Sequence, residues 1–257
     1  MEIGLLITDL DQLGAVAEWG YQYAETVPQI LGLDDGELRR RAMGQLAHAP
    51  LPVKSLCGFI PDPEGQGLMV VGPAADLGRL RAFVRRVFSV MQEAGIGVIG
   101  YGSGGSRWVP EGFPSDRALA QVRDFLHLCG EEGATRGVRV ALEPYNRDDA
   151  NLLNEVPEAL EVVRQVNHPG AQLMADFFHM KLNGESFSVL DPAGPHLIHA
   201  HIAEPGRGRP QTTPAEHAQF LQALRHAGYE GLVTQTGALP VYASEAEAAA
   251  ALREACR

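Results

Sequence analysis

The chain has 257 residues, of which 45% are hydrophobic and 21% are charged, and it contains 29 glycines and 17 prolines. This composition excludes a disordered or collagen-like chain, and the length suits a barrel of alternating strands and helices that folds as one domain over residues 1–257. The formal net charge of −11 repels nucleic-acid backbones and anionic lipid, so we expect neither a nucleic-acid nor a membrane partner.

Short apolar runs typical of buried strands recur along the whole chain. In order, the predicted strands are Ile3–Ile7, Gln22–Glu25, Val53–Phe59, Val98–Tyr101, Val138–Glu143, Gln172–Asp176, Leu197–Ala203 and Gly231–Thr236. Between them, apolar residues spaced three and four apart predict helices at Leu10–Trp19, Gly36–His48, Asp76–Ala94, Ser115–Glu131, Val156–Gln165, Pro214–Ala227 and Ser244–Cys256. The interval after Asp176 has the weakest helical pattern. This alternation predicts an α/β fold, a single-domain (β/α)8 TIM barrel.

The cysteines and the N-terminal segment indicate the cellular compartment. Cys57, Cys129 and Cys256 are odd in number and form no C-x-x-C pair, so we expect neither a disulfide framework nor a thiolate zinc site. The N-terminal segment shows no basic lead with a cleavage site, and no run approaches the roughly 18 apolar residues of a membrane span. We therefore expect a soluble cytoplasmic protein.

The carboxyl ends of the strands are where a TIM barrel places its active site. The fifth predicted strand ends at Glu143, which is either a functional carboxylate at the barrel mouth or a buried structural one paired with Arg147 or Arg107. The sixth ends at Asp176, with His179 three residues later.

The seventh predicted strand carries His199 and His201, which share one face because side chains alternate along a strand. Either histidine taken alone is also compatible with a core position. Together, Glu143, Asp176 and His201 would emerge at the same height from three consecutive strand ends. One imidazole and two carboxylates suit a divalent ion such as Mn²⁺, Mg²⁺, Co²⁺ or Zn²⁺, with positions left open for substrate oxygens.

This combination of groups suits the enolisation of a hydroxy-ketone. A bound ion would stabilise the negative charge that develops on the substrate oxygens, while a nearby carboxylate moves the proton on carbon. The sequence therefore predicts an isomerase or epimerase whose partner is a small-molecule carbohydrate.

Several motifs, each weak alone, occur together in a characteristic order: the loop Tyr101–Pro114, EPYNR from Glu143, NLLN from Asn151, NHPG from Asn167, the D-x-x-H of Asp176, and HAHIAEPGR from His199. With them the sequence resembles the xylose isomerase-like TIM barrel superfamily of sugar phosphate isomerases and epimerases, in particular D-tagatose 3-epimerase and hydroxypyruvate isomerase. The resemblance covers nearly the whole chain.

The resemblance implies roles for individual residues. Glu143, Asp176 and His201 match metal ligands, and Glu143 also matches a proton-transfer carboxylate. The positions that match substrate contacts are Asp149, where the family more often has glutamate, together with His179 and Arg207. Arg107 matches a residue at the barrel mouth that braces Glu143 or binds an anionic substrate group.

The last strand departs from the family pattern. There the family has a glutamate that serves as fourth metal ligand and second base, whereas this strand reads GLVTQTGALP, with Thr236 at the aligned position and Gln235 before it. A glutamine oxygen can ligate a metal but is no base near neutral pH. We take Gln235 as the candidate fourth ligand, although strand alternation would turn it away from the barrel centre if Thr236 points inward, unless a bulge shifts the register.

The missing glutamate leaves several reactions open. Inversion at carbon needs proton transfer on two faces, which Glu143 alone does not provide. A one-base 1,2-shift, a lyase or dehydratase step, a second base supplied by His179 or a metal-bound hydroxide, and a degenerate protein that binds sugar or metal without turnover remain as alternatives.

The sequence also bears on two other classes of protein and on the oligomeric state. A DNA-repair endonuclease of similar barrel type needs more metal ligands and a basic groove, which the charge of −11 disfavours. A non-catalytic sugar or metal sensor would be distinguished by binding without turnover. The long loops after the fourth and seventh strands are candidate surfaces for a homodimer.

Overall fold

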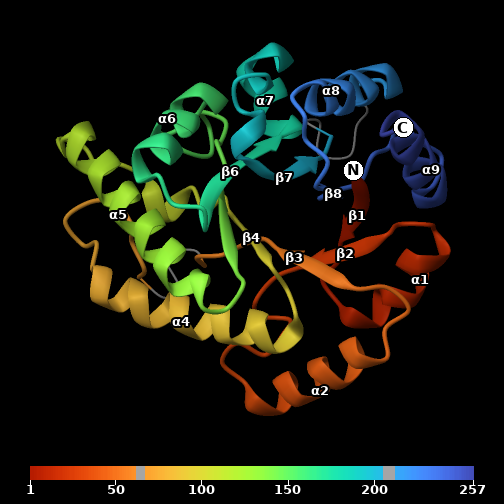
Figure 1. Cartoon of the computed structure of the whole chain (residues 1–257), viewed down its shortest axis with the longest axis horizontal. Coiled ribbons are helices and arrows are strands. Elements are labelled where there is room, and N and C mark those ends of the chain that lie inside the picture. Colours follow the sequence, from red (N-terminus) through yellow and green to blue (C-terminus); the bar gives the residue numbers. More distant parts are fainter. Residues whose placement is uncertain (62–66, 205–211) are drawn as a thin grey trace.

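The chain folds into a closed barrel of parallel strands, seen in the computed structural model, which describes residues 1–61, 67–204 and 212–257 (Figure 1). The strands follow one another in sequence order around the barrel, and β1 closes it by pairing with β8. They are β1 Glu2–Leu6, β2 Tyr23–Thr26, β3 Val53–Leu56, β4 Val98–Tyr101, β5 Arg139–Leu142, β6 Ala171–Asp176, β7 Leu197–Ile202 and β8 Leu232–Gln235. This confirms the predicted (β/α)8 barrel.

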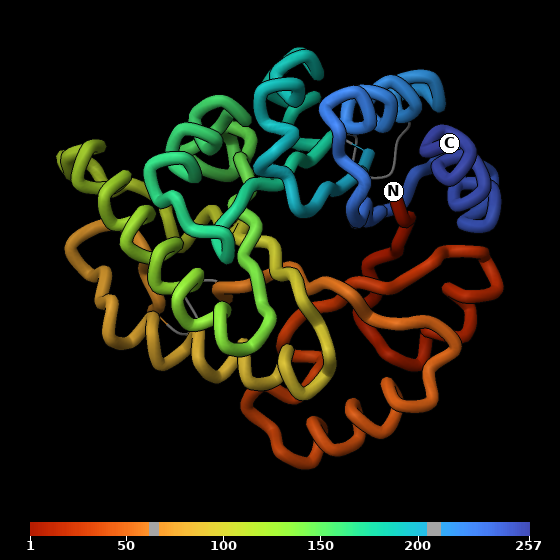
Figure 2. The backbone as a smooth tube through the Cα atoms, in the orientation of Figure 1, coloured from red at the N-terminus to blue at the C-terminus, as the bar shows by residue number. Residues whose placement is uncertain are grey.

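Helices surround the barrel, and Figure 2 shows the chain running once around, so that the C-terminal helix ends beside the N-terminal strand. The helices are α1 Leu13–Glu18, α2 Gly36–Ala47, α4 Leu77–Ala94, α5 Ser115–Ala134, α6 Val156–Val166, α7 Phe177–Asn183, α8 Pro214–His226 and α9 Glu245–Ala255. No helix in these described parts of the chain is both long and apolar enough to cross a bilayer.

Polar side chains start many of these helices. The side chains of Asp35, Asp76, Thr213 and Ser244 accept hydrogen bonds from main-chain N–H groups in the first turns of α2, α4, α8 and α9. The interval with the weakest helical pattern holds the seven-residue α7 and two 3-10 turns. Since β3 pairs with β4 only at Ser55 and Leu56, the strand predicted to reach Phe59 ends earlier.

The apolar core has two layers. The larger one lies between the barrel and its helices and includes stacked and tilted rings of Phe59, Phe83, Phe88 and Phe125. Burying each such ring contributes about 1.5–3 kcal/mol. A small second layer inside the barrel consists of Val98, Ala141 and Met174. Because side chains alternate along β6, Met174 and Asp176 share the inward face, which places Asp176 nearer the mouth.

Candidate active site

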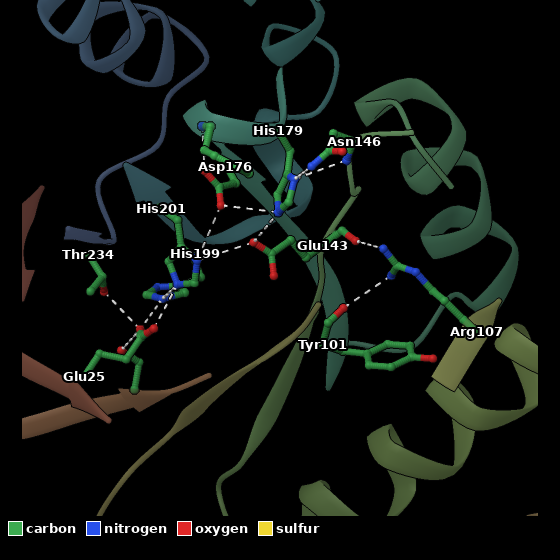
Figure 3. A network of polar contacts seen from close by, with 12 residues as sticks. Glu25, Tyr101, Arg107, Glu143, Asn146, Asp176, His179, His199, His201 and Thr234 are labelled. Carbon is green, nitrogen blue, oxygen red and sulfur yellow. Dashed lines mark hydrogen bonds and ion pairs between the residues drawn. The ribbon is translucent and has the colours of Figure 1, made fainter. Parts of the chain in front are cut away.

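The predicted metal ligands meet at the carboxyl end of the barrel. Glu143 directly follows β5, Asp176 ends β6, and His201 lies in β7 in register with Asp176. His201 Nδ1 is 3.4 Å from Glu143 Oε1 and 3.9 Å from Asp176 Oδ2 (Figure 3). All three side chains are buried, and ligand atoms of the three lie within 4.8 Å of one another.

Asp176 is held by the helix that follows it. Its Oδ1 accepts a 2.7 Å hydrogen bond from the main-chain N–H of Phe178, so that Asp176 caps the start of α7. The cap fixes the carboxylate plane, and Oδ2 is the oxygen that faces His201 and His179. The turn from β6 into α7 therefore orients one oxygen toward the site.

These residues fit a divalent cation. Two ligand atoms that each lie about 2.0–2.2 Å from an ion are at most about 4.4 Å apart, and the separations of 3.4 and 3.9 Å from His201 Nδ1 meet this limit. Burial, with Glu143 close by, raises the pKa of Asp176 to about 6. Two neighbouring buried carboxylates repel each other, and a cation between them would remove that repulsion.

His201 lies between two acidic side chains, Glu25 on one side and Glu143 on the other. Burial disfavours its imidazolium form, but Glu25 and Glu143 outweigh burial and raise the pKa of His201 well above its ordinary value. Burial likewise opposes ionisation of Glu25, yet His201 and His199 hold the pKa of Glu25 well below its ordinary value.

His179 is held as a hydrogen-bond donor toward the site. Its Nδ1 lies 3.1 Å from the main-chain N–H of Asn146 and 2.9 Å from the Asn146 side-chain amide nitrogen, so Nδ1 accepts and the proton resides on Nε2. That Nε2 is 4.0 Å from Glu143 Oε1 and 3.8 Å from Asp176 Oδ2. Burial lowers the pKa of His179, which favours this neutral form, and the Tyr145 ring stacks on it at 4.1 Å.

Two other predicted site residues lie behind the site. Asp149 is exposed and accepts a 2.6 Å hydrogen bond from the Asn146 amide, which in turn contacts His179. Arg107 is fully buried and donates from Nη2 to the main-chain oxygen of Glu143 at 2.5 Å. Arg107 thus contacts the backbone of Glu143. Arg207 lies outside the described residues.

Strand β8 turns Gln235 away from the barrel centre. Gln235 Oε1 accepts a hydrogen bond from the Tyr21 hydroxyl at 2.6 Å, and its amide donates to Glu245 of α9 at 2.8 Å. Thr234 instead points inward to Glu25, and Thr236 lines the pocket. The structure therefore does not bring Gln235 to the proposed ligands, because β8 pairs with β7 in unbroken register and supplies no bulge to turn it.

The site opens into a cavity of about 580 Å³. The polar or titratable residues that line it are Cys57, Glu143, Tyr145, Asp176, His179, His201, Glu204 and Thr236. Burial, with Glu25 and Glu143 nearby, raises the pKa of the Cys57 thiol well above its ordinary value, so Cys57 stays protonated.

Glu25 is the residue that sequence reasoning missed. It is completely buried, and its carboxylate lies against both His199 and His201. The signal was present, because Glu25 is an acid within the predicted strand Gln22–Glu25, as Glu143 is at the end of the fifth. Alternation along the strand predicts the shared face of His199 and His201 but does not identify Glu25 as their common partner.

A comparison with known proteins identifies the family. The model of the xylose isomerase-like TIM barrel family matches residues 13–254. The chain belongs to this family. The fold agrees, since a 3-keto-D-glucoside 4-epimerase structure from E. coli in its apo form, another such barrel, superposes with a TM-score of 0.77 at 20% identity, over 99% of this chain and 98% of that one.

Curated relatives of this family member match over shorter stretches. An L-ribulose 3-epimerase of Methylomonas sp. (strain DH-1) is 38% identical over 111 residues, 42% of this chain and 38% of the relative. A putative hydroxypyruvate isomerase of Streptomyces coelicolor is 36% identical over 116 residues, 42% of each chain. The matched stretches thus span well under half of these relatives.

Proposed function

We propose that this protein is a divalent-metal-dependent isomerase or epimerase that acts on a small polyhydroxy ketone or aldehyde through an enediolate, with Glu143 as the proton-transfer carboxylate. The observation that carries the proposal is the convergence of the buried side chains of Glu143, Asp176 and His201 in the lining of one cavity. The matched L-ribulose 3-epimerase and hydroxypyruvate isomerase support a carbohydrate substrate.

Glu143, Asp176 and His201 would hold the ion, which we expect to be Mn²⁺, Mg²⁺, Co²⁺ or Zn²⁺. When bound, the ion supplies positive charge that stabilises the developing enediolate. Nothing in these three side chains is soft enough to select a thiophilic metal, so the choice among the four depends on availability and geometry.

The chain's own groups provide the proton chemistry. Glu143 would take the proton from the hydroxyl-bearing carbon next to the carbonyl and return it to the former carbonyl carbon, while the hydroxyl proton passes to the former carbonyl oxygen. His179, whose Nε2 carries a proton directed at the site, would donate a hydrogen bond to a substrate oxygen. By resemblance we also propose substrate contacts for Arg207 and Asp149, and Asp149 in addition accepts a hydrogen bond from Asn146, which contacts His179.

The side chains at the end of β8 favour proton transfer on only one side of the substrate. Thr236 lines the pocket at the position where a second carboxylate would be needed, and a threonine hydroxyl is no base near neutral pH. We therefore favour a 1,2-isomerisation over inversion at carbon. The same observation favours, as the second candidate, a family member that binds sugar or metal without turnover.

The test is a substrate panel in D₂O. The protein loaded with each of the four ions would be incubated with ketopentoses, ketohexoses and hydroxypyruvate, and NMR would follow conversion and the entry of deuterium at carbon. We expect conversion by the wild type and a loss of about 10²- to 10⁴-fold in Glu143→Gln. An aldose product indicates a 1,2-shift, whereas an epimer indicates inversion. Binding of sugar and ion without conversion or exchange would contradict the proposal and favour the sensor.

A further inference from the structure

Beneath the proposed metal ligands lies a second polar cluster, made of Glu25, His199, Ser55 and Thr234, that the proposed reaction does not use. The Glu25 carboxylate is its centre. Glu25 Oε2 accepts a hydrogen bond from Ser55 Oγ at 2.5 Å. It also accepts one from Thr234 Oγ1 at 2.9 Å and lies 2.6 Å from His199 Nε2 (Figure 3). Glu25, Ser55, His199 and Thr234 are fully buried. A buried carboxylate with so many donors at one oxygen is rigidly held.

The proton of His199 can be assigned from its contacts. His199 Nδ1 is buried and has no hydrogen-bond partner among the described residues. A proton on Nδ1 would therefore be a buried donor without an acceptor, which is costly. The proton belongs on Nε2, where Glu25 Oε2 accepts it at 2.6 Å.

His201 presents its two ring nitrogens to opposite sides. Its Nδ1 faces Glu143 Oε1 at 3.4 Å, and its Nε2 lies 2.9 Å from Glu25 Oε1. His201 Nε2 is also 3.1 Å from His199 Nε2, but that nitrogen donates to Glu25 and so has no lone pair to offer. The acceptor left for the Nε2 proton of His201 is Glu25 Oε1, which lies 2.9 Å away and is otherwise a buried oxygen without a hydrogen bond among the described residues.

We propose that Glu25 is a positioning residue that accepts the Nε2 proton of His201 and thereby presents the Nδ1 lone pair of His201 to the divalent ion. This inference rests on the metal site of the proposed function. A carboxylate behind a ligating imidazole fixes its tautomer and orientation and raises its basicity, and losing such a partner costs about 10- to 100-fold in metal affinity.

Strand β8 takes part in this support. The Tyr23 hydroxyl lies 2.7 Å from Thr234 Oγ1, and since Thr234 donates to Glu25, the Tyr23 hydroxyl is the donor to Thr234. Strand β8 thus supports the site indirectly, because Thr234 donates a hydrogen bond to the Glu25 carboxylate beside His201. The residue of β8 that takes this part is Thr234 and not the neighbouring Gln235.

A second cation held by Glu25, His199 and His201 is the competing explanation, since these residues also offer three clustered ligand atoms. The hydrogen bonds argue against it. Glu25 Oε2 already receives two hydroxyl protons and the His199 proton, and a cation at Nε2 of both histidines would have to displace the protons assigned there. We therefore assign one ion, bound through Nδ1 of His201.

The test combines metal titration with the position of the His201 proton. Calorimetric titration of Mn²⁺ and Zn²⁺ into the wild type, Glu25→Gln and Tyr23→Phe would give affinity and stoichiometry, with thermal melting of each metal-free protein as the check on folding. Tyr23→Phe is the matched control, because the buried hydroxyl that it removes lies outside this cluster and contacts Thr234. We expect one site in the wild type, about 10- to 100-fold weaker binding in Glu25→Gln, and a change under about threefold in Tyr23→Phe.

The second measurement uses the wild type, so it does not require that any variant folds. In Zn²⁺-loaded wild type labelled with ¹⁵N-histidine, we expect His201 to keep its Nε2 proton and to bind zinc through Nδ1. Zinc on Nε2, two bound ions, equal affinity in wild type and Glu25→Gln, or no metal binding by the wild type would each overturn the inference. Metal binding as expected, without any turnover on the sugar panel, would contradict the proposed function alone.

Discussion

Arg107 donates a 2.5 Å hydrogen bond to the main-chain oxygen of Glu143, so the strand end that carries the proposed catalytic carboxylate is held by a fully buried guanidinium. The same guanidinium donates to the main-chain oxygen of Tyr101 at 3.4 Å and lies over the rings of Tyr101 and Tyr145 at 5.6 and 5.1 Å. Burial lowers the pKa of Arg107, although Tyr101 and Tyr145 favour its charged form. Arg107 therefore contacts the end of β4 at Tyr101 and the segment after β5 at Glu143 and Tyr145.

We expect Arg107→Lys to lower both stability and turnover. A lysine cannot reproduce the planar fork that reaches both carbonyl groups, so the Glu143 oxygen loses its donor at a cost of about 1–3 kcal/mol. Urea unfolding and steady-state kinetics would measure both effects. The matched control is Arg147→Lys, because Arg147 forms an exposed pair with Glu155 and its replacement should change stability by less than about 0.5 kcal/mol. A raised KM with unchanged stability in Arg107→Lys would indicate direct substrate binding instead.

Gly102 leaves room for the Glu143 carboxylate. A Cβ added at Gly102 would overlap Glu143 Oε2 and the Tyr145 ring. We expect Gly102→Ala to displace the carboxylate and lower kcat by about 10²-fold, since a shift of about 1 Å at a reacting group has that effect. Gly14→Ala in α1 is the control, because its Cβ meets nothing within 4 Å, and activity should be retained. Equal kcat in wild type and Gly102→Ala would show that the position of Glu143 does not limit the rate.

Replacing Thr236 should install the missing strand-eight carboxylate. Thr236 lines the pocket, so Thr236→Glu would add a fourth ligand, and we expect about tenfold tighter Mn²⁺ binding, equal to about 1.4 kcal/mol. Gln235→Glu is the matched control, because its side chain points to Tyr21 and Glu245, where a second carboxylate would only destabilise the fold. Tighter Mn²⁺ binding by Gln235→Glu than by Thr236→Glu would contradict the observed orientation of these two side chains.

Glu185 makes stability depend on pH away from the site. Its Oε1 accepts the main-chain N–H of Val156 at 2.8 Å, while its Oε2 is buried without a partner among the described residues. Burial raises the pKa of Glu185 to about 7, and the nearby Glu155 and Glu158 add to this effect. Because the folded state holds this proton more tightly than the unfolded chain, the stabilisation is complete below the unfolded pKa of about 4.3 and is lost as the pH rises through about 7.

The variant Glu185→Gln tests this dependence. It carries no charge at any pH, so we expect its Tm to exceed that of the wild type at pH 8 and to differ less at pH 5. Thermal melting at both pH values measures the difference. If the difference in Tm between the wild type and Glu185→Gln is the same at pH 5 and at pH 8, Glu185 titrates normally in the folded protein.

Much of the fold followed from local patterns. The strand predicted at Val98–Tyr101 has the observed bounds, and the others differ by only a few residues, because two-residue and 3.6-residue periods are written in neighbouring positions. Glu143, Asp176 and His201 could be selected for the same reason. They end or nearly end consecutive parallel strands, and such ends must meet at one end of a closed barrel.

The partners of these residues were decided by tertiary structure. Glu25 and His199 are 174 positions apart, and they touch because the barrel closes and brings the inward faces of β2 and β7 together. The outward turn of Gln235 depends on the register that β8 takes beside β7 and β1. Alternation along one strand determines which residues share a face. Which face turns into the barrel, and which residues it contacts there, depends on the hydrogen bonds to the neighbouring strands. No period in the local sequence encodes that pairing.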